Sequence, residues 1–170
     1  TPKGERWDGL FMSHELYNAG HLYEAAVIHY KATGKRNFLD IALKNADLIV
    51  KTFGEGELKI AAVPGHQIIE TGLIKLYQIT GKNEYINLAK YFLDNRGNPK
   101  NHKLFGPYSQ DHIPVVYQDE VVGHSVRAVY MYAAMTDIAA IQNDSLYQAA
   151  VNKLWDNMVS KKMYITGGIG

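Results

Sequence analysis

Residues 14–39 read HELYNAGHLYEAAVIHYKATGKRNFL, and this stretch carries the clearest structural signal in the chain. Its apolar side chains recur every three or four residues, which is the spacing of one helix face: Leu16, Ala19, Tyr23, Ala26, Val27 and Tyr30. The opposite side is apolar as well: Leu22, Ala25 and Ile28. We therefore expect a helix over residues 14–33, buried on several faces and ended by Gly34.

The turn that ends this helix occurs again later in the chain. The sequence ATGK at residues 32–35 is matched by ITGK at residues 79–82, 47 residues further on. IQND at residues 141–144 stands in the third equivalent place. Self-similarity at such a period is typical of stacked helix pairs, because one pair alone cannot bury its apolar face.

Apolar periodicity predicts six helices in three antiparallel hairpins, over residues 14–33, 37–53, 68–80, 84–96, 120–141 and 145–160. The first helix of each pair is apolar nearly all round, and the second keeps one polar face. This alternation suits the inner and outer helices of an (α/α)6 toroid, or a helical solenoid. We predict an all-α fold of helical hairpins forming part of an (α/α)6 toroid. Residues 1–170 then make one partial domain with no second domain.

Composition limits the classes of function. With a formal net charge of +1, nothing indicates nucleic acid or an anionic membrane as a partner. No apolar run approaches the ~18 residues that a membrane-spanning helix needs. The chain has no cysteine, which excludes disulfides, thiolate metal sites and a cysteine nucleophile within these residues. We expect a cytoplasmic location, with the periplasm and secretion as alternatives.

Both ends of the sequence look unlike those of a complete protein. The chain opens at Thr1, and residues 164–170 (YITGGIG) have the apolar, glycine-rich character of the start of a loop. We interpret the chain as a segment of a longer protein. Half of a toroid exposes the apolar surface of its inner helices, so we expect the isolated fragment to self-associate.

Each of the three apolar helices carries a histidine toward its N-terminal half: His21, His66 and His124. Inner helices of a toroid run parallel, so these imidazoles are expected at one mouth. Glu24 and Glu70 follow the first two histidines on the same helices. A histidine in a helical core is more often a structural group than a ligand-binding one, and both interpretations stay open at this point.

A long loop over residues 98–118 is the second candidate region, because it is polar and interrupted by prolines and glycine. Asp111 and His112 lie in it and are suited to hydrogen bonding sugar hydroxyls, although loop capping explains them equally well. Three aromatic residues lie outside the helical core spacing and are suited to stacking on sugar rings: Trp7, Tyr108 and Tyr117.

Other motifs fail on inspection. HELYN at residues 14–18 resembles the zinc motif H-E-x-x-H, but Asn18 replaces the second histidine. The closing TGGIG lacks the Lys-Ser/Thr of a phosphate loop. Glycosidases need two positioned groups that flank the scissile bond, and no pair of carboxylates can be singled out. We therefore assign no catalytic residue and no metal ligand.

Several segments together resemble the catalytic domain of the β-L-arabinofuranosidases of glycoside hydrolase family 127. They are residues 14–39, PGHQ at 64–67, QDH at 110–112 followed by PV at 114–115, VGHSVRA at 122–128 and KMYITGGIG at 162–170. The resemblance spans essentially the whole chain in the right order.

That resemblance implies the first half of a six-hairpin toroid and a retaining hydrolase that acts on an oligosaccharide or glycan. It also implies zinc in the complete enzyme, a zinc-bound cysteine as nucleophile and a glutamate as acid/base, all beyond Gly170. The residues it carries over to a sugar pocket are His21, His66, His124, Glu24, Glu70, Asp111 and His112.

The sequence departs from the family in two places. Ile68 stands where the family commonly has an acidic residue, and Val116-Tyr117 stands where it commonly has Arg-Glu. Both positions are expected at the rim of the pocket, so both affect which sugar the pocket binds. Two other functions stay open: another toroid enzyme, such as an epimerase or a uronic-acid-active enzyme, and a helical-repeat binding module without activity.

Overall fold

The computed structural model describes residues 6–100 and 102–170, and the regular structure there is helical. Six α-helices occur in this part of the chain: α1 (Glu15–Thr33), α2 (Asn37–Thr52), α3 (Ile69–Thr80), α4 (Asn83–Asn95), α5 (Ser125–Gln142) and α6 (Ser145–Asn157). Apart from two isolated bridges, these residues form no β-structure. The all-α prediction is confirmed.

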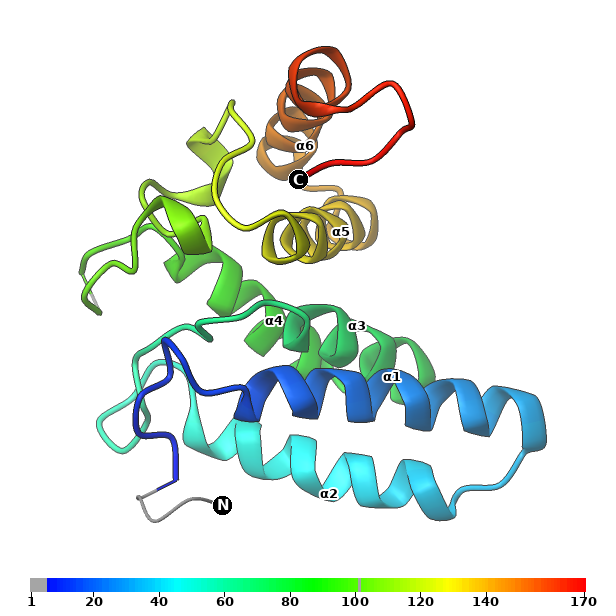
Figure 1. Cartoon of the computed structure of the whole chain (residues 1–170). Coiled ribbons are helices and arrows are strands. Elements are labelled where there is room, and N and C mark those ends of the chain that lie inside the picture. Colours follow the sequence, from blue (N-terminus) through cyan, green and yellow to red (C-terminus); the bar gives the residue numbers. More distant parts are fainter. Residues whose placement is uncertain (1–5, 101) are drawn as a thin grey trace.

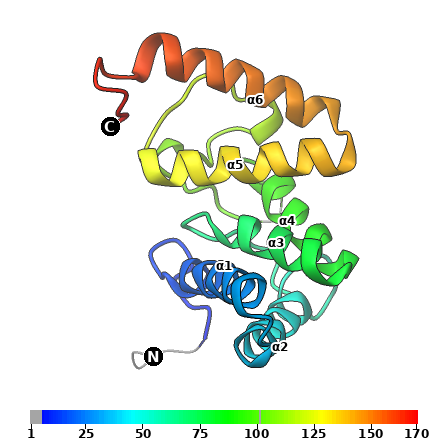
Figure 2. The same cartoon turned by 90° about the vertical axis from the view of Figure 1, so that its right-hand side faces the viewer.

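The helices form three hairpins that stack in chain order (Figure 1). In Figure 2 the α1/α2 pair lies at the bottom, α3/α4 in the middle and α5/α6 at the top. The first helices of the pairs pack on one another, α1 against α3 and α3 against α5, while α2, α4 and α6 each pack on their own partner. The inner and outer layers predicted from the sequence are therefore present, and they have the arrangement of an (α/α)6 toroid.

The repeated turn has a structural cause. Gly34, Gly81 and Asn143 each adopt the left-handed conformation that ends a helix, with φ of 70°, 71° and 53°. Each backbone N–H bonds to the carbonyl four residues earlier, which satisfies a helix-end acceptor. Asparagine replaces glycine in the third turn because it also tolerates this conformation.

The inner helices α1 and α3 touch backbone to backbone at two glycines. A Cβ atom on Gly20 would lie 2.8 Å from the Cα of Ile69, and one on Gly72 would lie 2.7 Å from the carbonyl oxygen of Gly20. No larger residue fits there without moving a helix. This contact sets the distance between α1, which carries His21, and the start of α3, which follows His66.

The predicted helix boundaries need two corrections. The helix expected from residue 120 begins at Ser125, because Gln110 Nε2 donates to the carbonyls of Val122 and His124 and holds this approach extended. At the other end, α6 stops at Asn157 and continues as one π-helical turn, Met158–Lys162. The remaining boundaries agree within one residue.

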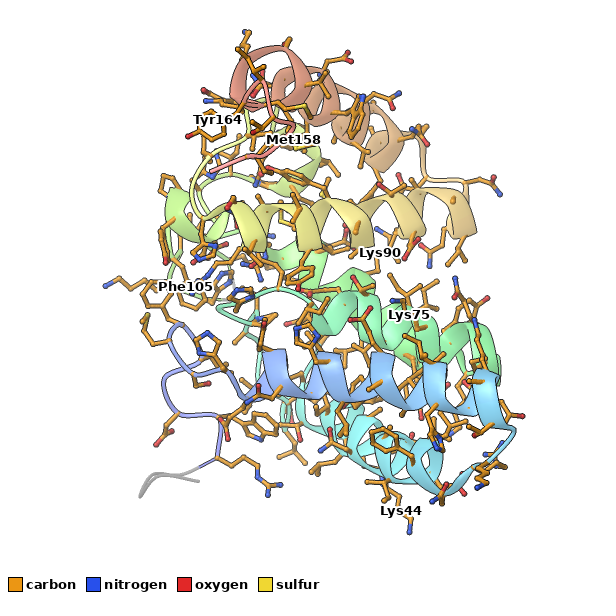
Figure 3. All side chains as sticks on the ribbon, turned by 45° about the vertical axis from the view of Figure 1, so that its right-hand side comes forward. Lys44, Lys75, Lys90, Phe105, Met158 and Tyr164 are labelled. Atoms are coloured by element: carbon orange, nitrogen blue, oxygen red, sulfur yellow. The ribbon has the colours of Figure 1, made fainter. Side chains whose placement is uncertain are left out.

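A long connection runs from residue 96 to residue 124, and its described residues, 96–100 and 102–124, include two short 3-10 turns, Pro107–Ser109 and Val115–Tyr117. Figure 3 shows Phe105 of this connection beside the end at which α1 and α5 begin. This agrees with the rim loop predicted for residues 98–118. No helix in the described ranges is both long and apolar enough to cross a bilayer.

Candidate functional site

Histidines from three successive hairpins meet at the end where the inner helices begin. His66 lies at the centre, with ring centroids 5.6 Å from His14 and 5.8 Å from His124. Tyr17 contacts both His66 and His21, at 4.5 Å in each case. Tyr130 completes the group, 5.9 Å from His21 and 6.2 Å from His66. We call these six residues the histidine cluster.

The cluster contains the three predicted histidines, but two of them do not lie on the helices where the sequence pattern placed them. His21 lies on α1, whereas His66 precedes α3 by three residues and His124 is the N-cap of α5. Only one of the three is thus part of a helix body. The other two are on the segments that enter the helices, where ring positions depend on loop geometry.

Sequence reasoning missed His14, Tyr17 and Tyr130 as members. The spacing between Tyr17 and His21 is four residues, so the pair on one helix face was visible in principle. His14 is seven residues from His21 and shares that face as well. Tyr130 had no signal in the sequence, since its membership depends on the packing of α5 against α3.

His66 is held as a neutral imidazole. Its Nδ1 lies 2.8 Å from the carbonyl oxygen of Gln67, which can only accept, so Nδ1 carries the proton. Burial lowers the pKa of His66 to about 4; the hydrogen bond to Gln67 opposes this shift, and the positive charge of Arg127 adds to it. At neutral pH the other nitrogen, Nε2, is therefore a hydrogen-bond acceptor.

Glu24 lies at the edge of the cluster. Its carboxylate is 3.6 Å from Nδ1 of His21 and also accepts a hydrogen bond from Lys75 of α3. Figure 3 shows Lys75 on α3, at the level between α1 and α5. Because Glu24 retains some exposed surface, it is the predicted acidic residue that can still reach a ligand beside the cluster.

Glu70 does not join the cluster surface. Its side chain is fully buried, accepts a hydrogen bond from the Ile68 N–H at 3.1 Å and lies 3.8 Å from the Arg96 guanidinium. Burial raises the pKa of Glu70, and the nearby guanidinium offsets only part of that shift. With no exposed atom, Glu70 has no surface on which a sugar can bind, and its contacts are those of a structural residue.

Asp111 is likewise enclosed in the long connection. It accepts hydrogen bonds from the backbone N–H groups of Phe105, at 2.8 Å, and Gly97, and from His102 Nε2 at 3.0 Å. Burial alone would raise the pKa of Asp111, but these donors outweigh it and hold the pKa below its ordinary value. His112 is half-buried and makes no ring contact with the cluster among the described residues. The structure thus separates the Asp111-His112 pair from the three histidines.

Of the three suspected aromatic residues, Tyr108 alone reaches the cluster. Its ring meets His124 edge to face at 5.5 Å, and half of its surface is exposed. Trp7 packs on Phe53 instead, and Tyr117 projects into solvent. Tyr108 therefore extends the cluster toward the long connection.

The described residues do not fit a zinc site. No group of three histidine, cysteine, aspartate or glutamate side chains within them is arranged to hold a metal ion. The sequence also lacks the cysteine that zinc–thiolate chemistry needs. The cluster instead offers imidazoles and phenols, which donate to and accept from hydroxyl groups of a neutral polyol. Such a gathering of histidines is not expected of a binding module whose histidines are scattered and solvated.

Comparison with known proteins gives one consistent result. A family described as "Beta-L-arabinofuranosidase, GH127 catalytic domain" matches residues 2–170. The non-reducing end β-L-arabinofuranosidase of Bifidobacterium longum subsp. longum is 35% identical over 183 aligned residues, covering 97% of this chain. The chain spans only 28% of that relative's length.

Solved structures agree. A family 127 β-arabinofuranosidase superposes with a TM-score of 0.92 at 57% identity, covering 98% of this chain and 26% of that one. A family 127 β-L-arabinofuranosidase from Geobacillus stearothermophilus T6 gives a TM-score of 0.93 at 46% identity, covering 99% of this chain and 29% of that one.

Proposed function

The chain belongs to the catalytic-domain family of the glycoside hydrolase family 127 β-L-arabinofuranosidases, and from that membership we propose what the protein containing it does. It removes β-L-arabinofuranosyl groups from arabinose-containing glycans. The 170 residues contribute part of the sugar pocket, and they do not carry out the bond cleavage by themselves.

The observation that carries this proposal is the histidine cluster. A furanosyl group presents several hydroxyls at fixed angles, and each can donate one hydrogen bond and accept others. The neutral His66 ring supplies an acceptor at Nε2, while Tyr17 and Tyr130 supply hydroxyls that can do either. His21, from the first hairpin, and His124, at the start of α5, are the further contacts that we assign to the sugar.

Chemistry is assigned elsewhere in the protein. Glycoside hydrolysis requires two groups flanking the scissile bond, and the described side-chain contacts of the cluster include one carboxylate with exposed surface, that of Glu24 beside His21. We propose that nucleophile, acid/base and zinc come from outside these 170 residues. The role of this chain is to bind and orient the glycone.

The test is hydrolysis of an aryl β-L-arabinofuranoside by the full-length protein and by residues 1–170 alone. We expect the full-length protein to release L-arabinose and the shorter chain to release none. Product analysis separates a hydrolase from an epimerase, because an epimerase changes configuration without releasing a free sugar. Turnover by residues 1–170 alone would contradict the division of roles.

A matched pair of variants tests the pocket itself. In the full-length protein, His21→Ala should raise KM for the arabinofuranoside about tenfold, equivalent to one lost hydrogen bond of ~1.4 kcal/mol. His29→Ala is the control, because His29 lies on the same helix but packs on Phe38 instead of the cluster. Equal effects of the two substitutions would remove His21 from the pocket.

A further inference from the structure

Arg127 lies beneath the histidine cluster on the first turn of α5, and only 3% of its surface is exposed. Its Nη1 donates to the carbonyl oxygen of Gly65 at 2.7 Å and to the Ser109 hydroxyl at 2.8 Å. Its guanidinium also stacks 4.9 Å from the Tyr108 ring. One side chain thus joins the segment before His66, the long connection and the helix that His124 caps.

The same loop positions both histidines. Gln67, next to His66, donates from Nε2 to the Ser109 carbonyl and to the Gln110 side chain, at 3.0 Å each. Gln110 donates in turn to the carbonyl oxygens of Val122 and His124. The His124 N–H donates to the Tyr108 carbonyl at 3.0 Å. Residues 108–110 are therefore the common support of His66 and His124, and Arg127 binds this support directly.

Arg127 is unusual because it is a buried cation without a carboxylate partner in the described part of the chain. Its buried counterpart Arg96 has a carboxylate, that of Glu70, at 3.8 Å, whereas Arg127 forms no ion pair within the described residues. The Nε atoms of both arginines lack a hydrogen-bond partner there. A buried cation without a counter-ion costs stability, so packing alone does not account for an arginine at this position.

We infer that Arg127 is a positioning residue of the sugar pocket: it fixes the backbone under His66 and the loop that supports His124. This inference rests on the proposed function for its ligand, a furanosyl group. Arg127 has too little exposed surface to contact the sugar and acts through the two histidines.

Arg127 also influences the protonation state in which His66 binds the ligand. The titratable and charged groups that face His66 come from two of the inner helices and their caps: His14 at the N-cap of α1, Tyr17 within α1, His124 at the N-cap of α5, and Arg127 and Tyr130 within α5. Arg127 is the permanent cation among them, and it opposes protonation of the imidazole. A neutral His66 with its proton on Nδ1 keeps the Nε2 lone pair available to a sugar hydroxyl.

The test compares Arg127→Met and Arg127→Lys in the full-length protein, with Arg36→Met at the exposed N-cap of α2 as the control. Methionine removes both charge and hydrogen bonds, while lysine keeps the charge but cannot bridge Gly65 and Ser109 in the same way. We expect Arg127→Met to lower kcat/KM for an aryl β-L-arabinofuranoside about 100-fold, the scale of a 1 Å misplacement. Arg127→Lys should recover part of this loss, and Arg36→Met should have no effect.

The pH profile is the readout that a merely structural role would not move. In the wild type, protonation of His66 limits binding only near its pKa of about 4. In Arg127→Met this acidic limb of kcat/KM should move up only part of the way, because burial, the largest cause of the lowered pKa, is unchanged; in Arg127→Lys it should stay in place. An acidic limb that is the same in all three proteins overturns the inference.

A crystal structure of Arg127→Lys separates this inference from the proposed function, because it needs no activity. We expect the His66 and His124 rings to be displaced relative to one another, with residues 108–110 shifted. Unchanged rings in that variant overturn the positioning role even if the enzyme is an arabinofuranosidase. Displaced rings in a protein that releases no arabinose would sustain the role of Arg127 and reject the proposed function instead. If Arg127→Met does not fold, kinetics and structure of Arg127→Lys alone decide.

Discussion

Replacing Gly20 with alanine should destabilise the chain, although alanine is the better helix former. The substitution places a methyl group between α1 and the start of α3. Its carbon would lie 2.8 Å from three backbone atoms of Ile68 and Ile69, against at least 3.4 Å for an ordinary contact. Backbone atoms cannot rotate away as a side chain can, so one of the two inner helices has to move.

The magnitude follows from two opposing effects. Alanine is favoured over glycine inside a helix by ~1 kcal/mol, whereas overpacking a tight core costs about 1–3 kcal/mol. The contact is with rigid backbone, so we take the upper end of the second range and expect a net loss of about 2 kcal/mol. For a chain of this length such a loss lowers the melting temperature by about 4–8 °C.

Urea and thermal denaturation followed by far-ultraviolet circular dichroism measure this effect. The control is Ala25→Gly, on an exposed position of the same helix, which should cost ~1 kcal/mol from helix propensity alone. The two substitutions change propensity in opposite directions, so a loss in both isolates the steric contact. A Gly20→Ala chain that is as stable as the wild type, or more so, would refute the close approach of α1 and α3.

Three further outcomes are expected. His66 has a folded-state pKa of about 4 and an ordinary value of 6.5, so unfolding takes up a proton between these values. The unfolding free energy should therefore fall by up to about 3 kcal/mol as pH drops from 6.5 to 4, and His66→Gln should lack this dependence in urea titrations. Asp111→Asn should lower the unfolding free energy by about 2 kcal/mol at neutral pH, through weaker hydrogen bonds to a neutral acceptor. Because the pKa of Asp111 lies below 3.8 when folded, the difference from wild type should vanish as pH falls through that region, and a difference that persists would be contrary to the assignment. Trp155 and Val129 line an apolar groove of about 300 Å³ between α5 and α6. Residues 1–170 should therefore self-associate in analytical ultracentrifugation, and Trp155→Ser should weaken the association. A monodisperse wild-type monomer would contradict this expectation.

Much of the fold was predictable because its determinants are local. The apolar spacing of α1 and the recurrence of its closing turn follow from backbone conformations that a few neighbouring residues select. Gly34 and Gly81 marked the ends of two helices in the sequence, and both adopt the left-handed conformation that such ends require. The start of α5 was misplaced because residues 121–123 continue the small and apolar character of the helix. The Gln110 side chain, from earlier in the same connection, instead bonds the carbonyls of Val122 and His124 and holds this approach extended.

Only part of the candidate site could be predicted from the sequence. The meeting of His21, His66 and His124 was predictable from the parallel direction of the inner helices, which is a property of the repeat. The burial of Glu70 and Asp111 was not predictable, because an acidic residue looks the same in a sequence whether its carboxylate faces a pocket or a buried hydrogen-bond donor.

Sequence alone therefore determined the hairpins, their order and the end of the molecule at which the histidines gather, since these follow from periodicity and short-range conformation. Tertiary structure decided which polar residues face a ligand and which, like Arg127, support those that do. Hydrogen-bond partners such as Gly65 and Ser109 lie 62 and 18 residues from Arg127. Only the packed distances between elements, which no local pattern encodes, select such partners.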